Sequence, residues 1–245
     1  MTYKPPSLFL FLREVPHIPF IWASRWREAR AVEVLVDPED DPPPIIVVPG
    51  LMSRDISTTL LRRTLKQSGF PTYASKMGFM RGVTRKRMKK AEKRLRKISK
   101  RHGRPVILVG WSLGGLYARV LAQRHPKRVA MVVTLGSPFS GSRKANNAWR
   151  VYEYLNKHTV DSPPVKDDAS LKPPVHTVAI WSKRDGIIAP SSARGQPNER
   201  DIAIEMKARH MTFGAGRREA AEIASIVKDE FEKAQKAAST ADEGG

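Results

Sequence analysis

The sequence predicts an α/β fold: a mainly parallel, doubly wound sheet flanked by helices. Short, unbroken apolar runs rich in Val and Ile are typical of parallel strands buried on both faces. These runs alternate with longer segments whose apolar residues recur at helical spacing, which is the order expected of a parallel sheet. A length of 245 residues with 40% hydrophobic content suits one domain, 1–245, with a full core.

The elements follow from these patterns in chain order. We expect strands at residues 45–48, 72–75, 106–109, 129–135, 175–181 and 202–206. We expect helices at about 54–67, within 81–101, and at 116–123, 148–155 and 217–237. Gly69 should cap the first of these helices, and the small residues of 238–245 predict a flexible tail.

Residues 1–36 form an N-terminal amphipathic segment, in which Trp22, Trp26 and other apolar residues are interleaved with arginines. Two interpretations remain open: a helix pair packed on the domain, or a segment lying in a membrane interface. The apolar run at 7–12 ends at Arg13 and Glu14, too short for an export signal or a membrane span. We therefore expect a cytoplasmic protein, with peripheral membrane association as the second interpretation.

The charge is strongly one-sided, with 44 Lys and Arg against 24 Asp and Glu, a net charge of +20. Such a chain is expected to meet polyanions. Segment 81–101 holds twelve Lys or Arg and one acid, Glu92, around an apolar seam at helical spacing. It lacks aromatic residues that could stack on bases, so contact with an anionic membrane surface or an acidic partner is favoured over nucleic acid recognition. A simply solvated helix face is the alternative, and no oligomeric state is predicted.

The sequence Gly110-Trp-Ser112-Leu-Gly114 lies between a predicted strand and a predicted helix. A G-x-S-x-G motif in this setting places a serine nucleophile on a strained turn. The two glycines avoid clashes where strand and helix pack closely. The helix that begins after Ser112 turns free N–H groups toward the serine, so the N–H of Leu113 can hold an oxyanion.

A serine nucleophile needs a base and a carboxylate that orients it. Of the six histidines, only His210 follows the last predicted strand, where a loop can bring imidazole to the serine. His158 is a second choice for the base. Asp185 follows the strand 175–181 at the expected edge of the sheet, whereas Asp201 precedes its strand and falls at the opposite edge. The sequence contains no cysteine, which excludes a thiolate metal site and a cysteine nucleophile.

Several segments resemble the bacterial lipase and esterase branch of the α/β-hydrolase family over about residues 45–235. They are Val-Val-Pro-Gly-Leu51, Gly-Trp-Ser112-Leu-Gly-Gly, Leu-Gly-Ser137-Pro-Phe-Ser-Gly-Ser142, Ser-Lys-Arg-Asp185-Gly-Ile-Ile and Arg-His210-Met-Thr-Phe-Gly. Relatives commonly carry histidine where this chain has Pro49 and Phe139. The resemblance implies hydrolysis of carboxylic esters with no cofactor and no metal.

The predicted mechanism is acyl transfer to water from a small-molecule or lipid ester. Ser112 attacks, His210 moves the proton, Asp185 holds the imidazole, and the N–H groups of Leu51 and Leu113 hold the oxyanion. Residues 139–174 follow a strand end and form a candidate lid. We expect the substrate to contact Met52, Trp111 and Phe139. An acyltransferase using the same triad, or a catalytically silent membrane-associated binding module, remains as an alternative.

Overall fold

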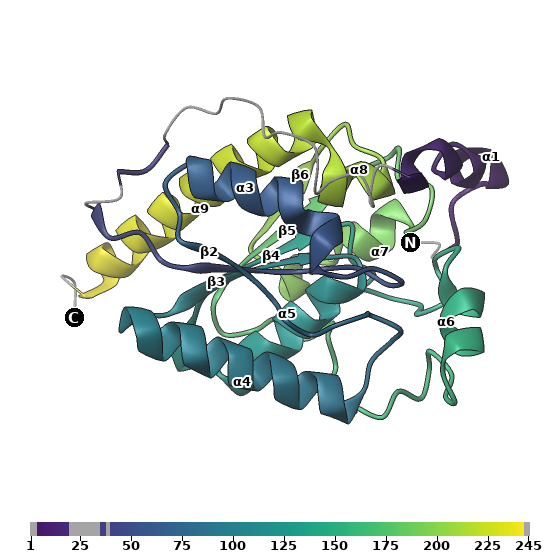
Figure 1. Ribbon diagram of the computed structural model, residues 1–245, viewed down its shortest axis with the longest axis horizontal. Helices are drawn as coiled ribbons and strands as arrows, with labels where there is room; N and C mark the ends of the chain where they lie inside the picture. Colours follow the sequence, from purple (N-terminus) through teal and green to yellow (C-terminus); the bar gives the residue numbers. More distant parts are fainter. Residues whose placement is uncertain (1–3, 20–34, 38–39, 243–245) are drawn as a thin grey trace.

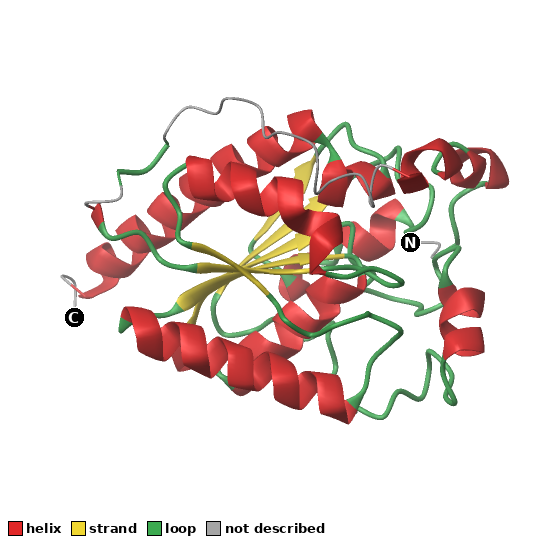
Figure 2. Cartoon of the chain, in the orientation of Figure 1, coloured by secondary structure: helices red, strands yellow, loops and turns green. Residues whose placement is uncertain are grey.

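The computed structural model describes residues 4–19, 35–37 and 40–242. Six strands form one sheet in the order β2-β1-β3-β4-β5-β6, and each strand is parallel to its neighbours (Figures 1 and 2). The strands are β1 (Ile45–Val48), β2 (Thr72–Ala74), β3 (Val106–Trp111), β4 (Val129–Leu135), β5 (His176–Trp181) and β6 (Ile202–Glu205). The predicted α/β class, the parallel sheet and all six predicted strands are confirmed.

Helices cover both faces of the sheet (Figure 1). The helices α3 (Thr59–Gln67), α8 (His210–Ala215) and α9 (Arg217–Asp242) contact one another on one face. The helices α4 (Arg85–His102) and α5 (Leu113–Arg124) pack together on the other. The shorter described helices are α1 (Leu8–Leu12), η1 (Val15–His17), η3 (Asp55–Thr58), η4 (Pro126–Arg128), α6 (Trp149–Leu155), α7 (Pro190–Arg194) and η5 (Pro197–Glu199).

The core lies on both sides of the sheet because side chains along each strand alternate between its faces. On β1, Ile45 and Val47 join the cluster under α3, α8 and α9, and Ile46 and Val48 join the cluster under α4 and α5. β3 alternates in the same way. Burial on both faces is the reason that these strands read as continuous apolar runs.

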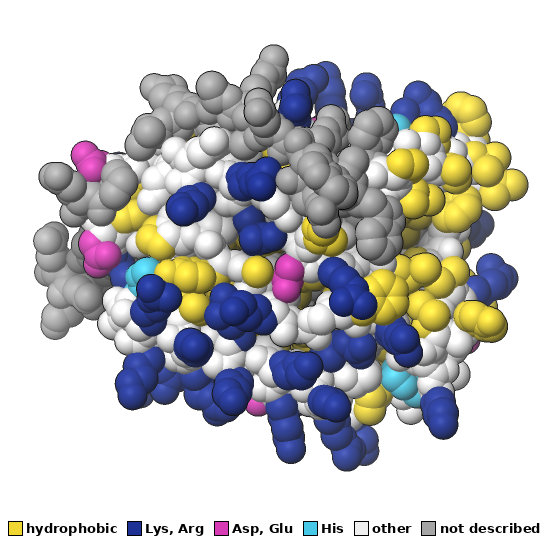
Figure 3. Space-filling model, viewed as in Figure 1, with side chains coloured by type: hydrophobic (Ala, Val, Ile, Leu, Met, Phe, Trp, Pro, Cys, Tyr) yellow, Lys and Arg dark blue, Asp and Glu magenta, His cyan; other side chains and the backbone are white. Residues whose placement is uncertain are grey.

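Helix α4 carries the basic segment. The Oγ1 atom of Thr84 caps its N-terminus by accepting a hydrogen bond from the Arg87 N–H at 3.2 Å, and Gly103 ends it with φ +65°. The predicted apolar seam is confirmed, since these residues are buried: Met88, Ala91, Leu95 and Ile98. Lys and Arg side chains cover the outer face of the helix (Figure 3).

Some boundaries differ from the prediction. α5 begins at Leu113, directly after the serine, and β3 continues to Trp111. α9 extends to Asp242, into the predicted tail, because its C-terminal residues include alanines that favour helix. Within 4–19, the chain forms α1 and η1, whereas Trp22 and Trp26 lie outside the described residues. No helix in the described part of the chain has the length and hydropathy needed to cross a bilayer.

Candidate active site

Ser112 occupies a strained turn between β3 and α5. Its φ is +54° and its ψ is −121°, a conformation that costs free energy for a residue with a Cβ atom. Its N–H donates to the Leu135 carbonyl at 2.9 Å, which fixes the turn to the end of β4. A Cβ atom at Gly110 would lie 2.4 Å from the Cα of Gly115, and one at Gly114 would lie 2.2 Å from the Val48 carbonyl oxygen. Close packing therefore requires both glycines of the motif, as predicted.

Asp185 and His210 form a buried pair. The His210 Nδ1 lies 2.8 Å from the Asp185 Oδ2, and the two side chains are 4% and 1% exposed. The Asp185 Oδ1 accepts hydrogen bonds from the N–H groups of Ile187 and Ile188, both at 2.8 Å. Each carboxylate oxygen thus has a separate partner, and the carboxylate is fixed to receive the imidazole. The structure brings together the two residues that the sequence predicts as base and orienting acid.

The surroundings of His210 favour its charged form. Burial lowers the pKa of the imidazole, but the charge and hydrogen bond of Asp185 and the charge of Glu14 outweigh burial. The net result is a pKa above the ordinary value of 6.5. His210 is accordingly a stronger base than a free imidazole, which suits a group that takes a proton from a serine.

Trp111 lies between the serine turn and the histidine. Its Nε1–H donates to the His210 carbonyl at 3.0 Å, and the two rings are 5.9 Å apart. Trp111 is the residue before Ser112, so this contact holds the start of α8 against the serine turn. Ser112, Asp185 and His210 follow the carboxyl ends of β3, β5 and β6, the edge of a parallel α/β sheet where ligands bind.

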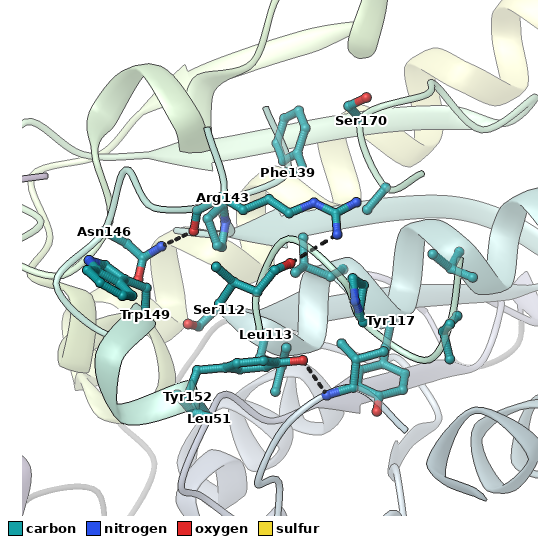
Figure 4. Close-up of a pocket in the computed structure, with 18 of the residues that line it drawn as sticks. Leu51, Ser112, Leu113, Tyr117, Phe139, Arg143, Asn146, Trp149, Tyr152 and Ser170 are labelled. Atoms are coloured by element: carbon teal, nitrogen blue, oxygen red, sulfur yellow. Dashed lines mark hydrogen bonds between the residues drawn. The ribbon is translucent and has the colours of Figure 1, made fainter. Parts of the chain in front are cut away.

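A cavity of about 430 Å³ opens beside Ser112 (Figure 4). Leu51 and Leu113, the predicted oxyanion donors, line it together with Phe139, the predicted substrate contact. Much of the remaining wall is apolar or aromatic, including Leu116, Val120, Trp149, Tyr152 and Val165.

Two residues predicted to contact substrate lie elsewhere. Trp111 is 2% exposed and absent from the cavity wall, because its ring packs beneath the serine turn and α8. Met52 is also absent from the wall; it is 49% exposed and its N–H donates to the Met80 carbonyl. Neither residue lines this cavity, so a contact of Met52 or Trp111 with substrate stays a prediction.

The candidate lid, residues 139–174, contains α6 and supplies much of the cavity wall, including Arg143, Asn146 and Ser170 (Figure 4). A buried arginine that the sequence did not single out ties it to α5. The guanidinium of Arg119 donates to the carbonyl oxygens of Ala169, Ser170 and Leu171, and of Glu199 beyond the candidate lid. Burial lowers the pKa of Arg119 to about 10, so it remains charged at neutral pH. An arginine on an otherwise apolar helix face was the available sequence signal.

Three other titratable side chains, those of His158, Tyr117 and Asp201, have structural partners. His158, the second choice for the base, lies with its Nε2 2.9 Å from the Tyr152 hydroxyl. Burial raises the pKa of Tyr117 to about 12, so this phenol stays neutral. Asp201 accepts from the Thr177 N–H at the amino end of β5, the edge opposite the site, as predicted. Among the described side chains, no group of three or more His, Asp or Glu could hold a metal ion.

Glu14 is a second residue that the sequence did not single out. Its carboxylate is buried beside Gly186 and His210, although it belongs to the N-terminal segment. An isolated acid within an apolar stretch is the sequence signal that marks such a residue.

Comparison with known proteins supports the same architecture. The sequence model of a family described as alpha/beta hydrolase fold matches residues 84–171. No curated protein matches the chain in sequence.

Solved structures share the fold at low sequence identity. The naproxen esterase (carboxylesterase NP) of Bacillus subtilis is 16% identical with a TM-score of 0.54, over 91% of this chain and 99% of that chain. The monoacylglycerol lipase of Paleococcus ferrophilus is 19% identical with a TM-score of 0.53, over 77% and 93%. The 2-hydroxy-6-oxo-6-phenylhexa-2,4-dienoate hydrolase of Rhodococcus sp. strain RHA1 is 11% identical with a TM-score of 0.55, over 80% and 92%. The family match over residues 84–171 and the shared architecture show that the chain has the α/β-hydrolase fold.

Proposed function

We propose that the protein hydrolyses carboxylic esters of apolar acids through a Ser112–His210–Asp185 triad and an acyl-enzyme intermediate. The observation that carries the proposal is the buried Asp185–His210 pair, which lies at the same sheet edge as the strained Ser112 and its cavity. The esterases and lipases among the structural neighbours make an ester the favoured substrate class.

The mechanism follows from the roles of the groups. His210 accepts the Ser112 proton as the serine oxygen attacks the ester carbonyl carbon. The N–H groups of Leu51 and Leu113 stabilise the oxyanion, and Asp185 stabilises the imidazolium. His210 then returns the proton to the leaving alcohol. Water, deprotonated by His210, attacks the acyl-enzyme and releases the acid.

The cavity wall favours an apolar acyl group. Leucine, valine and aromatic side chains make up much of the wall beside Ser112, and a volume of about 430 Å³ can hold an acyl chain of moderate length. An acyltransferase would use the same acyl-enzyme with an alcohol or amine in place of water. Product analysis with an added acceptor separates the two reactions.

The test is the loss of reaction in Ser112→Ala. A screen of nitrophenyl esters across chain lengths should find hydrolysis by the wild type, and Ser112→Ala should lower turnover on the order of 10⁶-fold, as is typical for such nucleophiles. A fluorophosphonate should label the wild type and not the variant. Ser142→Ala, a change at an exposed serine, is the matched control and should behave like the wild type. Near-normal hydrolysis by Ser112→Ala would overturn the proposal.

We further propose that the enzyme works at an anionic lipid surface. The outer face of α4 presents five exposed basic side chains around a shallow depression: Arg85, Lys86, Lys89, Lys90 and Lys93. Charge complementarity favours an anionic partner. Apolar side chains gather at the end of the molecule that carries α1 and α6 (Figure 3), where Leu8, Phe9 and Tyr154 are 71%, 67% and 90% exposed.

The apolar end adjoins the cavity. α6 supplies Trp149 and Tyr152 to the cavity wall and exposes Tyr154 to solvent. Phe11 of α1 packs in the same cluster as Ala148, the residue before α6. A lipid surface that contacts these side chains would therefore lie beside the cavity, with the basic face of α4 holding anionic headgroups.

A further inference from the structure

The N-terminal segment places a carboxylate inside the molecule and leaves apolar side chains outside. Glu14, between α1 and η1, is 1% exposed, whereas Leu8, Phe9 and Leu12 of α1 are all largely exposed. A carboxylate loses much hydration free energy on burial, so it needs several donors in return. The hydrogen-bond partners of the Glu14 carboxylate therefore show which part of the protein the N-terminal segment is attached to.

All the described partners of this carboxylate are backbone N–H groups, one in the loop that carries the acid and two in the first turn of α8, which begins at the base. The Glu14 Oε1 accepts from the Gly186 N–H at 3.0 Å and from the His210 N–H at 2.9 Å. The Oε2 accepts from the Met211 N–H at 3.1 Å. Gly186 directly follows Asp185. The Glu14 Oε1 atom therefore links the backbone next to the acid, Asp185, to the backbone of the base, His210.

Two further contacts fix the segment. The Arg209 guanidinium donates to the Arg13 carbonyl at 3.0 Å. The Asn147 side-chain amide donates both to the Pro6 carbonyl, at 3.1 Å, and to the Gly186 carbonyl, at 2.8 Å. The segment also packs tightly on Gly186, where an added Cβ atom would lie 2.3 Å from the Leu10 carbonyl oxygen. These contacts therefore fix the position of the Glu14 carboxylate, in addition to balancing its charge.

We propose that Glu14 is a positioning residue of the triad: its carboxylate holds the Asp185 loop against the start of α8, and thereby keeps His210 aligned with Ser112. This inference rests on the proposed function, since it assigns Glu14 a task in that triad. The residue acts through Asp185 and His210 and does not touch the substrate.

The isosteric variant Glu14→Gln separates this role from simple packing. The Gln amide has one acceptor oxygen and one NH₂ group. Its oxygen can accept from the N–H groups of Gly186 and His210, or from that of Met211, and its NH₂ group then faces the remaining N–H donor, with which it cannot form a hydrogen bond. The variant also removes a negative charge that acts on His210. The charged groups that act on the imidazole are Asp185 and Glu14, so a lower pKa of His210 is expected when Glu14 becomes neutral.

The experiment compares Glu14→Gln and Glu14→Asp with Asp201→Asn in the full-length chain. Asp201 is the matched control because its carboxylate also accepts from a backbone N–H, that of Thr177, but at the opposite sheet edge. Both Glu14 variants should lower kcat for nitrophenyl esters about 10- to 100-fold with little change in KM, the scale on which misplacement of about 1 Å lowers rates. Asp201→Asn should lower the Tm without changing kcat.

A second measurement does not depend on activity. The pKa of His210, followed by NMR on the signal that disappears in His210→Ala, should fall in Glu14→Gln and stay unchanged in Asp201→Asn. Wild-type kcat in both folded Glu14 variants would overturn the positioning role. If the wild type neither hydrolyses esters nor reacts with fluorophosphonate, the proposed function fails, and an unchanged His210 pKa in Glu14→Gln would then overturn this inference as well.

Discussion

The carboxylate of Asp185 is divided between two tasks, since its Oδ2 lies 2.8 Å from the His210 Nδ1 and its Oδ1 accepts the N–H groups of Ile187 and Ile188. The loop after β5 therefore sets the orientation of the carboxylate before the imidazole meets it. An imidazole that donates from Nδ1 presents an unprotonated Nε2, the form that can accept a serine proton.

Because one Asp185 oxygen contacts His210 and the other accepts backbone N–H groups, we predict a large loss of kcat in Asp185→Asn. The Asn oxygen would keep the two backbone N–H groups, and its NH₂ group would then face the His210 Nδ1. That contact favours the wrong tautomer, so kcat for ester hydrolysis should fall by roughly 10⁴-fold, the cost known for this kind of change. The stability should change little, because the substitution conserves shape. Steady-state kinetics and thermal unfolding measure both quantities.

The control for the base is His158→Ala, compared with His210→Ala. The His158 ring contacts Tyr152, a cavity residue, so its loss should affect substrate binding more than turnover. His210→Ala should reduce turnover as strongly as the loss of the serine. A larger loss of kcat in His158→Ala than in His210→Ala would show that the base is misassigned.

The raised pKa of His210 predicts the pH dependence. Catalysis needs the neutral imidazole, which is depleted as the pH falls through the pKa of His210. Because that pKa lies above the ordinary 6.5, kcat/KM should begin to fall at a higher pH than a free imidazole would give. In Asp185→Asn the residual activity should persist to lower pH, since the largest raising contribution has been removed. A pH–rate profile with the acid limb at or below 6.5 in the wild type would contradict the raised pKa.

The strands and the serine turn were predictable because local chemistry determines them. Burial on both sheet faces makes runs such as 106–109 continuously apolar, and the turn at Ser112 has no room for side chains at Gly110 and Gly114. Asp185 and His210 could be placed because each follows a strand in a parallel sheet, so both reach the same edge. Their pairing in the structure follows from topology.

Contacts between distant segments were not predictable in this way. Glu14 lies 172 to 197 residues from the backbone groups it binds, and Arg119 lies 50 to 80 residues from its carbonyl partners. No local pattern marks such partners. Trp111 and Met52 flank site residues in sequence, but neither lines the cavity. A residue that is adjacent in sequence to a site residue does not necessarily place its side chain in the cavity.

Arg119 predicts how the candidate lid is held. In Arg119→Met, the carbonyl oxygens of Ala169, Ser170, Leu171 and Glu199 lose a charged donor inside the protein. Hydrogen bonds to charged groups contribute about 1.5–3 kcal/mol each, so we expect a lower free energy of unfolding and faster cleavage by trypsin after Lys166, an exposed lysine of the candidate lid. Arg128→Met, at an exposed arginine, is the control and should change neither. A rate of cleavage after Lys166 in Arg119→Met no higher than in the wild type would contradict the anchoring role.

The last prediction concerns the basic face of α4. We expect the protein to sediment with liposomes that contain phosphatidylglycerol or phosphatidylserine, and to be released at high salt. Each Lys or Arg near such a surface contributes about 1 kcal/mol, and the effect decays over a Debye length of about 8–10 Å. Replacing Lys86, Lys89, Lys90 and Lys93 together by Gln should therefore weaken binding by roughly 4 kcal/mol on that scale.

The control replaces four lysines outside α4 by Gln: Lys183, Lys207, Lys228 and Lys233. Both variants have the same net charge, so a difference between them reports the position of the charges. A third variant, with Leu8, Phe9 and Leu12 changed to Ser, tests the exposed apolar end. It should weaken the liposome binding that remains at high salt, because salt does not screen the burial of apolar surface. Equal binding to neutral and anionic liposomes, or equal loss in the α4 variant and its control, would exclude docking through this face. In that case the basic helix would serve solubility, or an acidic protein or nucleic acid.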